Sequence, residues 1–152
     1  MEKVCIAYSS EADKWKVKSL IMTPQELLNF FIEIAPQFAE QWNSERNFSV
    51  RNDKTFTFHG VCSQFSYYFV DRKSFVETSL IERKVNPDIT LPNLKKLFNF
   101  IEENIYSFEV EDELDNALCT CFLEDIAKTK AGDYARNFMG KKSKKYYDSW
   151  NI

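Results

Sequence analysis

Histidine and cysteine, which could act as nucleophiles or metal ligands, are few in this chain of 152 residues. They are one histidine, His59, and four cysteines, Cys5, Cys62, Cys119 and Cys121. Cys119 and Cys121 are two positions apart on an expected helix, so they point to different faces and cannot easily form a disulfide with each other. No Cys-x-x-Cys pair occurs and His59 has no evident ligand partner, so the spacing of a zinc site is absent. A Cys–His nucleophile would require His59 beside one of the cysteines, which the sequence does not support.

Carboxylates are abundant, but their arrangement does not indicate general acid–base catalysis. They occur in runs on an expected exposed helix face, where carboxylates are solvated and keep ordinary pKa values. The chain also lacks the Gly-x-Ser-x-Gly and His-Glu-x-x-His patterns and a phosphate-binding glycine loop. We therefore expect no catalytic residues, no metal and no cofactor.

Acidic and basic residues are strongly segregated along the chain, although the formal net charge is only −3. Residues 99–125 contain nine acidic side chains and no lysine or arginine, whereas residues 128–145 contain seven basic side chains and one aspartate. A dense acidic patch raises the association rate with a basic partner. The alternative is that the basic tail folds back onto the acidic helix, and both interpretations can hold in part. The net charge argues against direct nucleic-acid binding by the whole chain.

The element that positions this acidic patch is an expected helix from Phe108 to Ala127. Apolar residues recur on one of its faces at helical spacing, and acidic residues crowd its first turns, where the helix dipole favours anions. Ser107 would cap its start. The apolar face consists of Leu114, Ala117, Leu118, Cys121, Phe122 and Ile126. The residues expected to be buried against one another in the core are Phe98, Ile101, Leu114, Leu118 and Phe122.

The starts of several other helices can be predicted from capping residues, prolines and apolar spacing. Thr23-Pro24-Gln25-Glu26 is a capping box with proline at the first helical position. Pro36 should end that helix, and a second one should run to about Trp42. Helical spacing returns at His59, and Thr90-Leu91-Pro92 opens a further helix. For residues 43–58 a hairpin and a structured loop both fit the pattern.

The tail and the amino end complete the expected fold. Gly132 and Gly140 should bound two short tail helices, whereas alternating apolar residues near the start predict a small β-hairpin within residues 1–21. Fourteen phenylalanines and only three glycines favour a helical core over many tight turns. We therefore predict a mainly α fold, a single-domain helical bundle over residues 1–152 with this hairpin at the amino end.

The chain carries no pattern for export or for crossing a membrane. Glu2 and Lys3 open it without a following apolar segment, and no apolar run approaches the roughly 20 residues that span a bilayer. We expect a cytoplasmic protein with reduced thiols and no membrane partner.

Three segments carry a resemblance to a known family. PNLKKLFNFIEENI, DNALCTCFLEDI and FMGKKSKKYYDSW, in this order, resemble the carboxyl half of small helical bacterial immunity proteins of polymorphic and contact-dependent growth-inhibition toxin systems. TPQELLNFFIEIAPQFAEQW is similar to the family's opening helix, whereas residues 1–21 and 72–90 have no counterpart. The resemblance implies that the protein binds and blocks a cognate toxin domain, often a nuclease, and has no activity of its own. Because binding surfaces diverge in such families, it assigns no contact residues.

The sequence thus predicts a toxin-neutralising immunity protein whose partner is a basic toxin domain, expected to be a nuclease. The alternative is a helical protein-interaction adaptor with a non-toxin partner, and an enzyme is a third, weaker interpretation. The charge pattern predicts that the partner-binding residues are Glu109, Glu111, Asp112, Glu113 and Asp115.

Overall fold

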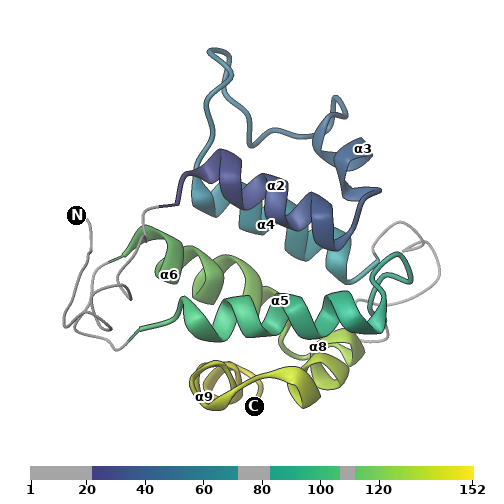
Figure 1. The fold of residues 1–152 in the computed structure, drawn as a ribbon, viewed down its shortest axis with the longest axis vertical. Coiled ribbons are helices and arrows are strands. Elements are labelled where there is room, and N and C mark those ends of the chain that lie inside the picture. The colour runs from purple at the N-terminus through teal and green to yellow at the C-terminus, as the bar shows by residue number, and fades with distance from the viewer. Residues whose placement is uncertain (1–21, 72–82, 107–111) are drawn as a thin grey trace, which may run out of the picture.

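A computed structural model of the chain describes residues 22–71, 83–106 and 112–152 (Figure 1). These residues form helices and no strands, so the predicted mainly α class is confirmed, and the expected amino-terminal hairpin lies outside them. In the order of the chain, the main helices are α2 (Pro24–Ile34), α3 (Phe38–Trp42), α4 (Phe58–Phe69), α5 (Leu91–Glu103), α6 (Glu113–Leu118), α7 (Glu124–Ile126), α8 (Lys130–Ala135) and α9 (Lys141–Trp150). Across the described ranges, no helix has both the length and the apolar character needed to cross a bilayer.

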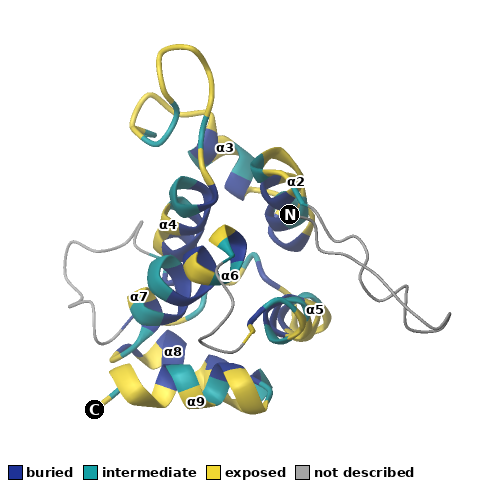
Figure 2. Cartoon of the chain, turned by 90° about the vertical axis from the view of Figure 1, so that its left-hand side faces the viewer, coloured by how far each residue is buried: buried dark blue, intermediate teal, exposed yellow. Residues whose placement is uncertain are grey.

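The helices lie in three tiers. Figures 1 and 2 show α2 and α4 together in the upper tier, α5 and α6 in the middle, and α8 and α9 below. Contacts between α2 and α4, between α4 and α6, and between α5 and α9 join the tiers. The buried faces of the helices turn inward to a common core, as Figure 2 shows by its dark blue segments.

The start of α2 follows the predicted capping box. The Thr23 hydroxyl accepts the Glu26 N–H at 3.1 Å, and the Glu26 carboxylate accepts the Thr23 N–H at 2.9 Å. The helix ends at Ile34, before Pro36, and α3 follows at once. Because both signals act within a few residues, this part of the fold could be predicted from local sequence alone.

The core is built largely from stacked phenylalanine rings. Phe31 of α2 stacks on Phe65 of α4 with ring centroids 4.1 Å apart, and Phe65 faces Phe122 at 5.8 Å. Phe122 also lies 6.1 Å from Phe98 of α5 and 5.2 Å from Phe69 of α4. Offset and edge-on aromatic contacts of this kind add to the stabilisation that comes from burial itself. The five expected core residues, Phe98, Ile101, Leu114, Leu118 and Phe122, are all buried in this cluster.

The acidic helix differs from its prediction in its start and in its regularity. It begins at Glu113, with Asp112 as its N-cap, so the predicted start at Phe108 with a Ser107 cap is wrong. After α6 the chain passes through a π-helical segment, η4 (Cys119–Leu123), and resumes as α7. Phe122 remains in the core, whereas Cys121 is only half-buried at its edge. A π-segment accommodates one extra residue in a helix, which simple helical spacing does not anticipate.

The structure also corrects the predicted helix boundary in the tail. Gly132 does not bound a helix but lies buried inside α8, where a Cβ would come within 2.1 Å of the Ile126 carbonyl oxygen and 2.3 Å of the Tyr147 hydroxyl. Gly140 does precede α9 as its N-cap, as predicted. The short 3₁₀ segment η5 (Arg136–Phe138) joins the two helices. Gly132 is therefore required by a close approach of the α7–α8 turn and α9 to α8, a contact between elements that local sequence does not reveal.

Candidate partner-binding surface

Two of the predicted partner-binding acids support the start of α6. The Asp112 carboxylate accepts the backbone N–H of Asp115 at 3.0 Å, which satisfies a free donor of the first turn. The Asp115 carboxylate accepts the backbone N–H of Tyr106 at 3.0 Å, so it ties the end of the α5 segment to α6. It also lies 3.5 Å from the Cys119 thiol, which donates to it. Asp112 and Asp115 therefore have structural roles whether or not they meet a partner.

Burial raises the pKa of Asp115, and the negative charge of Asp112 acts in the same direction. The Tyr106 N–H, the Cys119 thiol and the positive charge of Lys142 oppose these effects without cancelling them. The result is a half-buried carboxyl group that is less acidic than an ordinary aspartate.

Glu113 is the predicted acid that is free for a partner among those the structure describes. Its side chain is exposed, as is that of Glu103 at the end of α5, and neither makes a hydrogen bond or ion pair with a described residue. The contact between Tyr106 and Asp115 brings the end of α5 and the start of α6 together, at the left of Figure 1. We call Glu103 and Glu113 the acidic end. Glu109 and Glu111, the remaining predicted acids, lie outside the described residues.

The basic tail does fold back against the acidic part of the chain, but through hydrogen bonds. Glu102 of α5 accepts the backbone N–H groups of Lys142 and Ser143, each at 2.9 Å, and the Ser143 hydroxyl at 2.8 Å. Glu124 accepts a hydrogen bond from the Tyr146 hydroxyl. Between described residues, no ion pair joins lysines 141–145 to these acids. The fold-back interpretation therefore holds for Glu102 and Glu124. The acidic end takes no part in it, and its contact with a basic partner stays a prediction.

Glu102 replaces a side-chain cap that α9 lacks. Gly140 has no side chain to offer, and a Cβ there would lie 2.5 Å from the Glu102 carboxyl carbon. Burial raises the pKa of Glu102, but the N–H groups of Ser143 and Lys142, with the Ser143 hydroxyl, outweigh it and lower the pKa overall. A negative charge at a helix N-terminus is also favoured by the helix dipole.

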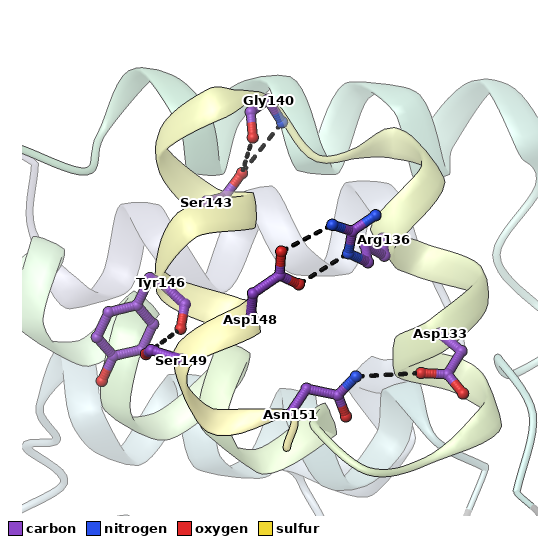
Figure 3. Close-up of polar contacts among 8 residues, drawn as sticks. All are labelled: Asp133, Arg136, Gly140, Ser143, Tyr146, Asp148, Ser149 and Asn151. Atoms are coloured by element: carbon purple, nitrogen blue, oxygen red, sulfur yellow. Dashed lines mark hydrogen bonds and ion pairs between the residues drawn. The ribbon is translucent and has the colours of Figure 1, made fainter.

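Further polar contacts hold α8 and α9 together (Figure 3). Arg136 forms a two-pronged ion pair with Asp148, with N–O distances of 2.8 and 2.7 Å. The Asn151 side chain lies 3.5 Å from the Asp133 carboxylate and accepts the backbone N–H of Lys128 at 2.6 Å. These contacts connect the end of α9 to the turn before α8. The ion pair between Arg136 and Asp148 raises the pKa of Arg136 and lowers that of Asp148, chiefly through the hydrogen bonds between the two side chains.

An exposed aromatic residue lies on a loop that the sequence analysis left open. Residues 43–57, between α3 and α4, form a structured loop that projects beyond the helices (Figures 1 and 2). Phe48 on this loop is 89 % exposed, whereas every other described phenylalanine is buried or half-buried. Its neighbours are held in place: the Asn47 side chain donates to the Trp42 carbonyl at 2.7 Å and accepts the Ser49 N–H at 2.9 Å.

The base of this loop is anchored to the helices. Phe56 packs edge-on against Trp42, with ring centroids 4.9 Å apart. The tip contains a tight turn in which Arg51 and Thr55 share a backbone hydrogen bond of 2.9 Å, with Lys54 at a φ of 73°. A hydrogen-bonded loop that presents one large apolar side chain has the geometry of an interface anchor, because a loop already held by its own contacts loses less entropy when it binds.

The structure also places side by side two residues whose contact the sequence did not predict. His59 Nδ1 lies 3.2 Å from Cys121 Sγ, 62 positions away, with both side chains half-buried. Burial raises the pKa of Cys121, partly opposed by the Thr120 hydroxyl, and the charges of Asp125 and Glu124 raise it further. An activated Cys–His nucleophile requires the opposite shift. Asp125, one turn beyond Cys121, accepts a hydrogen bond from the Ser66 hydroxyl at 3.1 Å.

Within the described part of the chain, no group of three or more His, Cys, Asp or Glu side chains could hold a metal ion. Comparisons of the chain with family models, with curated proteins and with solved structures found no match. The functional argument therefore rests on the arrangement of charge, exposure and hydrogen bonds in this molecule and on the resemblance noted in its sequence.

Proposed function

We propose that this protein is a toxin-neutralising immunity protein, which binds a basic toxin domain, expected to be a nuclease, and blocks it stoichiometrically in the cytoplasm. The observation that carries the proposal is the acidic end, where Glu103 and Glu113 are exposed and make no bond to a described residue. Nuclease domains must approach a polyanion and tend to have positive clefts. An inhibitor that presents carboxylates to such a cleft competes with phosphate and speeds its own association.

Phe48 supplies the second element of the proposed interface. Charged rims guide association, but most of the binding energy of a protein interface comes from a few large, desolvated side chains. A side chain that is 89 % exposed on an anchored loop is available for that role. The proposal assigns no catalytic activity to the chain and requires no cofactor.

The decisive experiment asks whether a neighbouring gene encodes a toxin domain, which the proposal predicts, and then uses that domain. We expect co-expression of the chain to restore growth of cells that produce the toxin, and the purified pair to co-elute as a stoichiometric complex. Titration of the chain into a nuclease assay should abolish activity at an equivalence point. A neighbouring toxin that stays fully active and unbound with excess chain would overturn the proposal. Tight binding to a non-toxin partner would instead favour the adaptor alternative.

A further inference from the structure

The contact between Cys121 and His59 distinguishes one thiol from the others. Cys121 belongs to the π-helical segment η4, and π-segments occur frequently at functional sites. His59 is the second residue of α4, which packs along η4. The two side chains meet at the rim of the core, half-exposed, with 3.2 Å between Nδ1 and Sγ. Cys62 and Cys119, the other described cysteines, are free thiols and buried.

We propose that Cys121, assisted by His59, is a site of covalent modification by small disulfides. In the exchange, His59 Nδ1 accepts the thiol proton while Sγ attacks one sulfur of the disulfide. The new Sγ–S bond forms as the original S–S bond breaks, and the second half of the reagent leaves as a thiolate. Cys121 is thereby oxidised to a mixed disulfide with one half of the reagent, the other half is reduced to the released thiolate, and His59 keeps the proton.

The neighbours of Cys121 explain why a base is needed. Burial raises its pKa, and Asp125 and Glu124 raise it further, so the group is held as a neutral thiol. The thiolate is the reactive form. A base 3.2 Å away can remove the proton as the S–S bond forms, so that a free thiolate need not accumulate first.

Burial explains why the reaction should be selective. Cys62 has no exposed surface, and burial raises its pKa well above the usual range. Burial also raises the pKa of Cys119 to about 12, and its thiol donates to Asp115. Among these three thiols, the contact with the imidazole is made by Cys121. On the folded chain, disulfide exchange should therefore be faster at Cys121 than at Cys62 or Cys119.

The test uses the full chain with Cys5→Ser, because Cys5 lies outside the described residues. The probe is the neutral disulfide 4,4′-dithiodipyridine, which the nearby carboxylates do not repel. Release of thiopyridone gives the rate, and peptide mass mapping gives the modified residue. We expect a single adduct on Cys121 under native conditions, and loss of the fast phase in Cys121→Ser.

His59→Asn is the matched variant for the role of the base. The asparagine amide can occupy the position of Nδ1 and hydrogen-bond to the thiol, but it cannot take up the proton. We expect this variant to react at least about tenfold more slowly, since a positioned general base typically contributes about a hundredfold or more. Equal rates in His59→Asn and its parent would overturn the proposal. So would labelling of Cys62 or Cys119 as fast as Cys121 in the parent chain, a result that needs no histidine variant.

Discussion

Ser143 donates both its backbone N–H and its hydroxyl to the same carboxylate oxygen of Glu102, at 2.9 and 2.8 Å. The two residues are 41 positions apart, and their contact fixes the start of α9 against the end of α5. The acidic and basic segments of the chain thus meet through a helix cap. Glu102 therefore has a structural role, unlike the carboxylates that remain available to a partner.

Glu102→Gln should weaken the attachment of α9. Loss of a helix cap typically costs about 0.5–2 kcal/mol in the free energy of unfolding. The pKa of Glu102 is lowered in the folded chain from its ordinary 4.5, so its contribution is present above that value and lost as pH falls through the folded pKa. Urea unfolding should therefore separate the variant from the parent most at about pH 7, and the difference should shrink as the pH is lowered below 4.5. A difference that does not change with pH would contradict this assignment.

Two substitutions at Asp112 separate its cap from its charge. Asparagine caps helices about as well as aspartate, whereas alanine does not. We expect Asp112→Ala to lower the free energy of unfolding by about 1 kcal/mol and Asp112→Asn to change it by a few tenths, measured by urea denaturation. Equal losses in both variants would show that the negative charge matters and the cap does not.

Reversing the charge of the acidic end tests electrostatic steering. The double variant Glu103→Lys, Glu113→Lys should slow association with the basic partner by roughly tenfold at low salt and flatten the salt dependence of the rate. Because both side chains are exposed and unbonded among the described residues, the thermal midpoint should stay nearly unchanged. Stopped-flow association across a salt series provides the measurement.

The control for steering is Glu40→Lys, an exposed acid on α3, outside the loop that carries Phe48. This substitution reverses one charge, as each change in the double variant does, but it leaves the ends of α5 and α6 unchanged. Association that is slowed equally by this control, or an unchanged rate in the double variant at every salt concentration, would exclude the acidic end as the steering surface.

Leu118→Ala should destabilise the fold by about 2–5 kcal/mol, the usual cost of truncating a core leucine. Leu118 has no exposed surface and lies in the same cluster as Phe122. Leu91→Ala is the matched control, because Leu91 is 50 % exposed and should change stability by no more than about 0.5 kcal/mol. Chemical denaturation compares the two. A loss below about 1 kcal/mol for Leu118→Ala would mean that this helix face is not packed as described.

Phe48→Ala should leave stability within about 0.5 kcal/mol, because the side chain packs on almost nothing in the free protein. If Phe48 anchors the partner, the same change should weaken affinity by at least about tenfold, as for typical interface hot spots. Calorimetric titration with the partner measures this. Tyr134→Ala is the control, since Tyr134 is 50 % exposed on α8 and lies outside the proposed interface. Equal affinity of Phe48→Ala and the parent would remove the loop from the interface.

Local sequence was a reliable guide where short-range chemistry decides the structure. The Thr23 capping box, the break at Pro36 and the start of α5 after Thr90 all appear as predicted, because each depends on residues within one or two helical turns.

The candidate site was less predictable, because carboxylates that look alike in the sequence have different hydrogen-bond partners in the structure. Asp112, Glu113 and Asp115 belong to one acidic run, yet one caps the helix, one is free and one binds the Tyr106 N–H. Nothing in residue type or spacing separates these three roles. The exposure of Phe48 was equally hidden, since a phenylalanine in an alternating segment usually indicates a buried position.

The sequence by itself determined the helical class, the positions of most helix starts, the identity of the core and the segregation of charge. These follow from apolar periodicity, capping residues and composition, which act over short stretches of chain. Only the tertiary structure decided that Glu102 would cap α9, that Gly132 would lie inside a helix, and that His59 would meet Cys121. Each of these depends on elements far apart in the chain that are brought within a few ångströms by burial of the common core, and hydrophobic burial specifies no polar partner in advance.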